Sequence, residues 1–475
     1  MSCGIFILLC GFYMLPVSSN FTRQTTLGLV RGKLEQWDNR SVECYLGIPY
    51  AAPPVKSLRF QPPQPHPGWK KPLDTIKFGP ICPQQLLSSG QLSGKEDCLW
   101  LNIYVPHKER IPDVNSELLP VMVWIHGGAF VLGSGNYKAH VLADFGQVIV
   151  VTINYRLGVF GFLSTGDSAA VGNSGLLDQR FAILWVKANV KHFGGNPDAI
   201  TIFGQSAGGA SVGLHCLSPL SSGLFKQAIL DSGVAIAPWA TRLDNPLLWV
   251  KKLASIVSCP VANSLKLISC LQRKKTLELI KGAIQLTNFN FTFVPTVDGS
   301  FLPKTPLELS ENTSLVKRFS YMAGVNSHEG SAFWPWIKEI KSQADFANYI
   351  MSFFQAGTEK TVSDAILWQY RDWMDLNYSS FHIQRQTLDA VGDVGFVAPL
   401  VMTGDFITKA SKVYVYYFTR RPNASVFPEW IGAGNGDELA FVFGIPIFGG
   451  PLIGEEEHVL NQQIMSYWTN FAKTG

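Results

Sequence analysis

A sharp turn between a strand and a helix constrains the fold of this chain more than any other feature. Residues 204–208 read Gly-Gln-Ser-Ala-Gly, after an apolar strand-like run at 201–203 and before a helix-like run at 207–217. Small residues two before and two after Ser206 avoid collision while the serine takes a strained backbone conformation. The pattern predicts Ser206 as a nucleophile at the carboxyl edge of a sheet, close to the positive end of the following helix. A chance pentapeptide is the alternative interpretation, and the strand and helix around it favour the nucleophile.

Strand and helix patterns alternate along the rest of the chain. Short β-branched runs flanked by glycine are typical of buried parallel strands, and apolar positions at helical spacing indicate helices. We predict strands at 121–125, 148–154, 201–203, 228–230, 321–325 and 413–418, helices at 175–190 and 207–217, and a turn at 194–197. This alternation favours an α/β fold, with a doubly wound, mostly parallel sheet and helices on both faces.

The size and composition of the chain fit one large domain. Its 475 residues are 47% apolar and 16% charged, which allows a large core. The length alone suggests about three domains, but the candidate residues at 206, 329 and around 435 require one core to bring them together. The net charge of +4 is small and dispersed, so nucleic acid is not expected as a partner.

The first nineteen residues resemble a signal peptide. Residues 3–17 are an apolar run that contains Pro16 and is followed by small polar residues. Since no Lys or Arg precedes the run, a short membrane anchor is the alternative, but a spanning helix needs roughly 20 apolar residues. Six glycosylation sequons support a secretory route, ending outside the cell or in the endoplasmic reticulum lumen; they begin at Asn20, Asn39, Asn290, Asn312, Asn377 and Asn423.

The cysteines form two close pairs in the sequence. Removal of residues 1–19 takes away Cys3 and Cys10 and leaves six cysteines. The pairs that could close short loops are Cys82 with Cys98, and Cys259 with Cys270. We expect the other two, Cys44 and Cys216, to be buried thiols.

A glycine-containing loop lies upstream of the turn. Residues 124–130 read Trp-Ile-His-Gly-Gly-Ala-Phe and follow a predicted strand. Backbone N–H groups aimed at one point can stabilise the oxyanion formed during acyl transfer, each by about 3 kcal/mol. The N–H groups of Gly128, Ala129 and Ala207 are our candidates for an oxyanion hole. An ordinary glycine turn after a strand is the alternative interpretation.

Several motifs together resemble the type-B carboxylesterase and cholinesterase family. Besides the turn and the glycine loop, the matching segments are 47–51 (GIPYA), 96–104 (EDCLWLNIY), 154–158 (NYRLG), 203–212 (FGQSAGGASV) and 468–472 (WTNFA). The resemblance implies an α/β-hydrolase fold over residues 20–475, a Ser-Glu-His triad, and hydrolysis of small carboxylic esters without a metal or cofactor. Family members continue beyond the segment that ends at Gly475, so the C-terminal end is expected to be truncated.

The resemblance also assigns individual residues. The family's triad acid falls on Glu329, which would otherwise be interpreted as a solvated loop residue. The family's disulfides fall on the two close pairs, which predicts Cys82–Cys98 and Cys259–Cys270 as bonds.

Three positions depart from the family pattern. Gln205 stands where a glutamate is common, which removes one negative charge from the site. The loop between Cys82 and Cys98 is short and lacks the tryptophan that contacts choline in cholinesterases, so choline esters are disfavoured. Asn435 stands where the family has the triad histidine, and an amide does not exchange protons usefully near neutral pH.

The third departure leaves two functional hypotheses. Other histidines at 126, 328 and 458 do not match the triad position. One hypothesis is a general carboxylesterase that acts through an acyl-enzyme on Ser206. The alternative is a catalytically impaired binding or adhesion protein built on the same fold.

Overall fold

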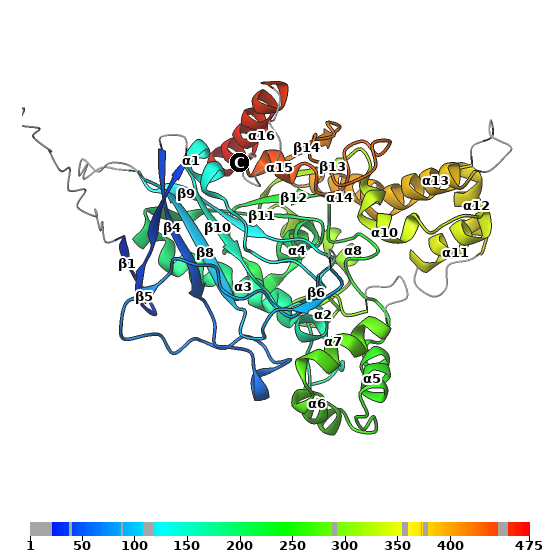
Figure 1. The fold of residues 1–475 in the computed structure, drawn as a ribbon, viewed down its shortest axis with the longest axis horizontal. Coiled ribbons are helices and arrows are strands. Elements are labelled where there is room, and N and C mark those ends of the chain that lie inside the picture. Colours follow the sequence, from blue (N-terminus) through cyan, green and yellow to red (C-terminus); the bar gives the residue numbers. More distant parts are fainter. Residues whose placement is uncertain are drawn as a thin grey trace, which may run out of the picture.

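The structure is a computed structural model, shown in Figure 1. It describes residues 21–37, 40–86, 89–107, 117–286, 292–353, 360–371, 373, 379–444 and 455–475. The predicted signal peptide at residues 1–19, with Cys3 and Cys10, lies outside the described residues. So do the sequon residues Asn20, Asn39, Asn290 and Asn377.

A nine-stranded sheet forms the centre of the molecule (Figure 1). In spatial order its strands are β14 (Val413–Phe418), β13 (Ser320–Asn326), β12 (Gln227–Asp231), β11 (Gly195–Gln205), β9 (Leu119–Ile125), β10 (Ile149–Ile153), β8 (Trp100–Pro106), β4 (Arg40–Pro49) and β3 (Lys33–Trp37). The strands from β14 to β10 run parallel, whereas β8, β4 and β3 continue the sheet in antiparallel pairs. The parallel strands therefore bring several carboxyl ends to one edge, where polar side chains can meet.

Two smaller sheets accompany the central one. A three-stranded sheet contains β1 (Thr22–Thr25), β2 (Gly28–Arg31) and β5 (Leu73–Asp74), and a two-stranded sheet contains β6 (Gln84–Gln85) and β7 (Leu92–Ser93).

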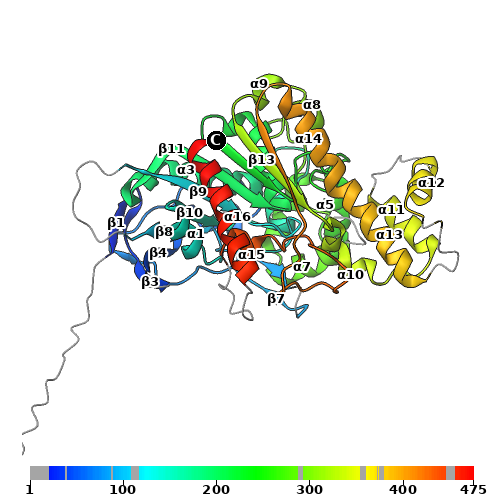
Figure 2. The same cartoon turned by 90° about the horizontal axis from the view of Figure 1, so that it is seen from above.

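Helices connect and cover these strands. They are α1 (His140–Gly146), α2 (Gly158–Phe162), α3 (Ser174–Asn189), α4 (Ala207–Leu217), α5 (Pro246–Ile256), α6 (Ser264–Arg273), α7 (Thr276–Gln285), α8 (Pro306–Ser310), α9 (Thr313–Val316), α10 (Trp334–Ile337), α11 (Gln343–Phe353), α12 (Lys360–Gln369), α13 (Ser380–Gly392), α14 (Ala398–Thr408), α15 (Leu439–Val442) and α16 (Glu455–Thr474). Helices α10 to α13 lie together at one end of the molecule (Figures 1 and 2).

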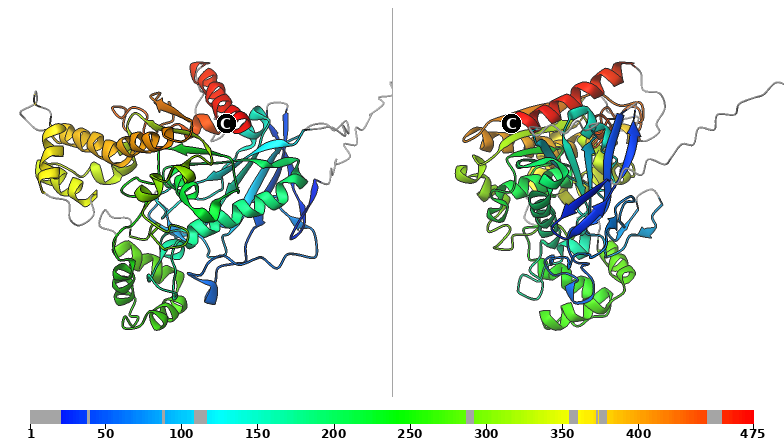
Figure 3. Two further views of the ribbon diagram at one scale, coloured as in Figure 1. Left: turned by 180° about the vertical axis from the view of Figure 1, so that it is seen from behind. Right: turned by 90° about the vertical axis from the view of Figure 1, so that its left-hand side faces the viewer.

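Helices cover both faces of the sheet, so the central strands are apolar on both sides. In β9, Val123 points into the core shared with α3 and α4, whereas the neighbouring Trp124 points into the core formed with α1, α15 and α16. The Trp124 ring packs against Phe203 and Phe443, with ring centroids 4.9 and 5.0 Å away. Figure 3 shows the red α16 on one side of the sheet and the green helices on the other.

The architecture confirms the predicted fold class. Helix α4 and strand β14 have the predicted bounds, and α3 differs from the predicted helix by one residue at each end. The predicted turn at 194–197 was wrong in extent. Gly194 adopts a φ of +84°, but β11 already begins at Gly195, which pairs with Leu119 of β9 before an irregularity that ends at Ile200.

The structure contains both predicted disulfides. Cys82 is bonded to Cys98, and Cys259 is bonded to Cys270, each with an S–S distance of 2.02 Å. Cys44 and Cys216 are free and buried, as expected.

One helical stretch in the described chain, Ser380–Thr408, is long and apolar enough to cross a membrane by length and composition. It comprises α13, a π-helical turn and α14, and it packs against the segment at 329–333 and against β14. The signal is weak, because core helices of globular domains meet the same criterion.

Candidate active site

Ser206 occupies a sharp turn between β11 and α4. Its φ of 56° and ψ of −122° lie outside the regions that residues with a Cβ normally adopt. The N–H of Ser206 donates a hydrogen bond to the carbonyl of Asp231 at 2.8 Å, which ties the turn to the end of β12. The backbone thus has the strand-turn-helix shape that the sequence predicts.

Three glycines leave the space that this turn needs. A Cβ on Gly208 would lie 2.0 Å from the Ile125 carbonyl oxygen, and one on Gly204 would lie 2.6 Å from the same atom. A Cβ on Gly233 would lie 2.1 Å from the carbonyl oxygen of Ser206. A side chain at any of these three glycines would overlap the backbone that packs around the turn. The turn is therefore held in place by close backbone contacts.

The glycine loop after β9 lies directly against Ser206. A Cβ on Gly127 would lie 3.2 Å from the Cβ of Ser206. Gly128 and Ala129 have φ values of +107° and +55°, so both residues of this loop take a left-handed backbone. No acceptor among the described residues takes the N–H of Gly128, Ala129 or Ala207. The three candidate oxyanion donors are therefore available to a ligand.

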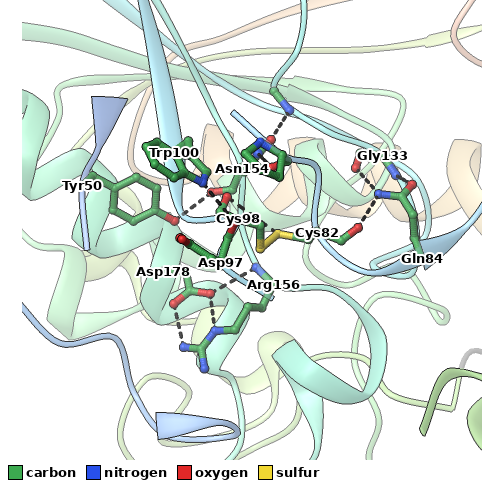
Figure 4. Close-up of a disulfide and its surroundings, with 12 residues drawn as sticks. Tyr50, Cys82, Gln84, Asp97, Cys98, Trp100, Gly133, Asn154, Arg156 and Asp178 are labelled. Carbon is green, nitrogen blue, oxygen red and sulfur yellow. Dashed lines mark hydrogen bonds and ion pairs between the residues drawn. A yellow bond between two sulfur atoms is a disulfide. The ribbon is translucent and has the colours of Figure 1, made fainter. Parts of the chain in front are cut away.

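Gln84, which was not expected from the sequence to belong to the site, bonds to the backbone just after this loop. Gln84 accepts a hydrogen bond from the Gly133 N–H at 2.8 Å and donates to the Gly133 carbonyl at 2.8 Å (Figure 4). It also donates to the Cys82 carbonyl at 3.0 Å, beside the disulfide to Cys98. Gln84 thus links the backbone beside the predicted disulfide to the chain just after the glycine loop, a connection that cysteine spacing could not reveal.

Glu329 lies three residues after the end of β13 and is buried. Its side chain accepts a hydrogen bond from the Asn326 N–H at 2.6 Å. Burial raises the pKa of Glu329 to about 7, although hydrogen bonds from Asn326 and Asn435 favour its charged form. The residue is not a solvated loop glutamate, which was the alternative interpretation of the sequence.

Asn435 lies between Glu329 and Gln205. Its Nδ2 donates to Oε2 of Glu329 at 2.6 Å, and its Oδ1 accepts from Nε2 of Gln205 at 2.9 Å. Its backbone N–H donates to Oγ of Ser331 at 2.8 Å. Position 435 is where the family resemblance implies the triad histidine, and the structure places the side chain at this position in contact with Glu329.

The histidines have other places in the structure. All nine belong to the described residues, and none lines the cavity in front of Ser206. His126 is buried, stacks on Tyr155 and bonds through Nδ1 to the Gly127 carbonyl; burial lowers its pKa to about 4. His328 bonds through Nδ1 to Oγ of Ser327, and His458 lies on α16 beside Gln462.

An apolar cavity of about 470 Å³ opens in front of Ser206. Its walls come from the glycine loop, from the chain around α10 and from the loop that carries Asn435. The lining residues are Gly128, Ala129, Val131, Leu132, Gln205, Ser206, Trp239, Ser331, Ala332, Phe333, Trp334, Pro335, Trp336, Phe396, Val426, Phe427 and Asn435. None of these residues carries a charged side chain, so the cavity suits an uncharged ligand.

Two further buried acids, Asp231 and Glu438, lie near Glu329, and neither was expected from the sequence. Asp231 accepts a hydrogen bond from the hydroxyl of Tyr416, and Glu438 accepts one from the Asn326 side chain. Burial raises the pKa of Asp231 to about 7 and the pKa of Glu438 well above its usual range. Within the described chain, no three His, Cys, Asp or Glu side chains are grouped to hold a metal ion.

Comparison with known proteins gives this site its family context. The model of the carboxylesterase family matches residues 19–475. Human bile salt-activated lipase is 38% identical over 464 residues, which cover 92% of this chain and 60% of the lipase. Mouse neuroligin-2 is 37% identical over 504 aligned positions, which cover 95% of this chain and 60% of neuroligin-2. The chain thus spans about three fifths of the length of these relatives.

Proposed function

This chain belongs to the carboxylesterase family, and from that premise we propose that it is a serine carboxylic ester hydrolase acting through Ser206. The observation that carries the proposal is the position of Ser206 on a strained turn at an apolar cavity, next to a loop in which the N–H groups of Gly128 and Ala129, like that of Ala207, bond to no acceptor among the described residues. This arrangement supports attack on an ester carbonyl whose oxygen is held by those donors.

In the proposed reaction, Oγ of Ser206 attacks the carbonyl carbon of the ester. The carbonyl oxygen becomes an oxyanion that accepts hydrogen bonds from Gly128, Ala129 and Ala207. Collapse of this intermediate breaks the bond to the alcohol oxygen, which leaves with the proton that the Ser206 hydroxyl gave up, and the acyl group stays on Oγ. Water then attacks the acyl-enzyme, one of its protons returns to Oγ of Ser206, and the acid is released.

Proton transfer is the weak step of this mechanism. Asn435 contacts Glu329 where the family has an imidazole, and its amide can orient a neighbour but cannot accept the Ser206 proton. Deleting the base of a serine triad reduces turnover by about a millionfold, while the oxyanion hole alone retains about a thousandfold catalysis over water. We therefore expect slow acyl transfer.

The cavity supports neutral, apolar esters as the substrate class. Trp239, Phe333 and Phe396 supply aromatic walls, and Gln205 replaces a carboxylate that would attract a cation. A general carboxylesterase is therefore a better match than a cholinesterase. The two disulfides support passage through the secretory pathway, with secretion or residence in the endoplasmic reticulum lumen as the destination.

A second function, ester binding without turnover, is favoured by one specific observation. Both functional groups of the Asn435 amide are engaged, by Glu329 and by Gln205, which leaves Ser206 without a proton acceptor in the described structure. In this case the cavity would recognise an acyl or ester group as part of a binding or adhesion protein.

Labelling and turnover distinguish the two functions. The parent chain is incubated with a fluorophosphonate probe and with p-nitrophenyl acetate, beside Ser206→Ala and Asn435→His. The hydrolase function is supported if the probe labels the parent chain and the parent slowly hydrolyses the ester, whereas Ser206→Ala is neither labelled nor active. An inert parent that gains turnover through Asn435→His supports the binding function instead. Equal turnover by the parent and by Ser206→Ala would exclude Ser206 as the nucleophile.

A further inference from the structure

Gln205 and Asn435 are in direct contact, although both depart from the family pattern. They are 230 residues apart in the sequence, and Nε2 of Gln205 lies 2.9 Å from Oδ1 of Asn435. Gln205 is buried with only 6% of its surface exposed, and both residues line the cavity in front of Ser206. The two departures therefore occupy one place in the fold.

The hydrogen-bonding capacities of the three groups fix the direction of this contact. Asn435 donates from its Nδ2, and Oε2 of Glu329 accepts this hydrogen bond. Its Oδ1 is then left to face residue 205 and needs a donor there. A glutamine supplies that donor, whereas an ionised glutamate would place two acceptors against each other at a buried position.

We infer that Gln205 and Asn435 form a matched amide pair, in which Gln205 is a positioning residue for Asn435. This inference rests on the proposed function, because it concerns the proton acceptor of Ser206. It makes the glutamine a second obstacle to an active triad, separate from the missing imidazole. Restoring histidine at position 435 then recovers only part of the activity.

The reason lies in the atoms that an imidazole presents. When its Nδ1–H donates to Glu329, the other ring atom bonded to Cγ is the carbon Cδ2, which cannot accept the Gln205 N–H. The remaining acceptor on the ring is Nε2, and its lone pair is the one that must take the Ser206 proton. The Gln205 N–H thus competes with the Ser206 hydroxyl for the base. A carboxylate at position 205 removes this donor and favours the imidazolium that forms during attack.

Four variants test the pair: Asn435→His, Asn435→His with Gln205→Glu, Asn435→His with Gln205→Met, and Gln205→Glu alone. The methionine variant removes the donor without adding charge, so it separates competition for the lone pair from electrostatics. Turnover of p-nitrophenyl acetate is measured across pH 5 to 9, with kcat and KM determined separately. Thermal melting of each variant establishes that it is folded.

We expect both double variants to exceed Asn435→His in kcat by about tenfold, with KM changed by less than about threefold. The apparent pKa of kcat should be higher with glutamate at position 205 than with methionine, because a carboxylate stabilises the imidazolium. Gln205→Glu alone should melt at a lower temperature than the parent. If Gln205 had only a structural role, the pH dependence of kcat would be the same with glutamate and with methionine at position 205.

Two outcomes would overturn the inference. One is an Asn435→His variant as active as either double variant. The other is inactivity of all three histidine variants while they remain folded and their Ser206 reacts with the fluorophosphonate, because something other than the amide pair would then block the site. Absence of fluorophosphonate labelling at Ser206 in every variant identifies a different failure, that of the proposed hydrolase function.

Discussion

The two halves of the candidate site are maintained in different ways. The half around Ser206 is shaped by backbone, since Gly204, Gly208 and Gly233 approach neighbouring main chain too closely to carry a side chain. The half around Asn435 is shaped by side chains, through hydrogen bonds to Glu329 and Gln205. A backbone-defined half resists substitution because any change disturbs the fold. A side-chain-defined half can exchange one group for another of similar size and lose its chemistry without losing its structure.

Substitution in the backbone-defined half should have the largest effect on stability. Gly208→Ala places a Cβ 2.0 Å from the Ile125 carbonyl oxygen, in a position that has no room to adjust. We expect destabilisation of about 3 kcal/mol, measured by denaturant unfolding, together with loss of fluorophosphonate labelling.

Gly404→Ala is the matched control. Gly404 lies on α14, where an added Cβ meets no atom within 4 Å, so alanine should stabilise the protein by up to about 1 kcal/mol. If the two substitutions changed stability equally, close backbone contacts would not define the half of the site around Ser206.

Loss of a disulfide should have a smaller effect that depends on its location. Cys82→Ser with Cys98→Ser opens a loop with a sequence separation of 16 and should cost about 3 kcal/mol or less. It should also slow labelling of Ser206, because Gln84 connects Cys82 to Gly133, just after the glycine loop.

The second disulfide provides the comparison for the first. Cys259→Ser with Cys270→Ser opens a loop of similar size, with a separation of 11, between α5 and α6. Stability should fall by a similar amount, while the labelling rate stays unchanged. If both pairs slowed labelling equally, the disulfide near Gln84 would have no special connection to the glycine loop.

The smallest effect on stability is expected from the titration of the buried acids Asp231 and Glu438. The pKa of Glu438 in the folded protein lies well above the usual 4.5, because burial disfavours the carboxylate and Asp231 lies nearby. The folded state therefore holds a proton that the unfolded state releases above about pH 4.5. The stability gained from that proton is fully present below this pH and is lost as the pH rises.

Glu438→Gln keeps a neutral side chain at every pH and removes this loss. The melting temperature of the parent should fall relative to that of the variant by about 2 °C or more between pH 5 and 8. Asp231 and Glu329, whose pKa values are raised to about 7, remain in both proteins, but Asp231 and Glu438 influence each other's titration, so the difference reports the pair rather than Glu438 alone. If the melting temperatures of the parent and the variant changed with pH in parallel, Glu438 would not hold a proton in the folded state.

The same contrast explains what the sequence could predict. The strand before Ser206 and helix α4 after it are encoded locally, by apolar runs and by glycines that permit the turn, and the fold class follows from their alternation. The contact of Asn435 with Glu329 was reached through family resemblance, because no local pattern joins residues so far apart. Gln84, Asp231 and Glu438 act through hydrogen bonds or burial that depend on distant segments, and their own neighbours in the sequence carry no signal of this.

The matched amide pair also has a consequence for how such a site can change over generations. In the genetic code, asparagine and histidine codons differ by a single base, and so do glutamine and glutamate codons. Each half of the pair is therefore one point mutation from the family residue, but the two steps are not equivalent. Changing position 205 first sets a carboxylate against the Asn435 carbonyl, whereas changing position 435 first leaves a folded site with partial activity. The accessible route between the amide pair and a complete triad runs through His at position 435.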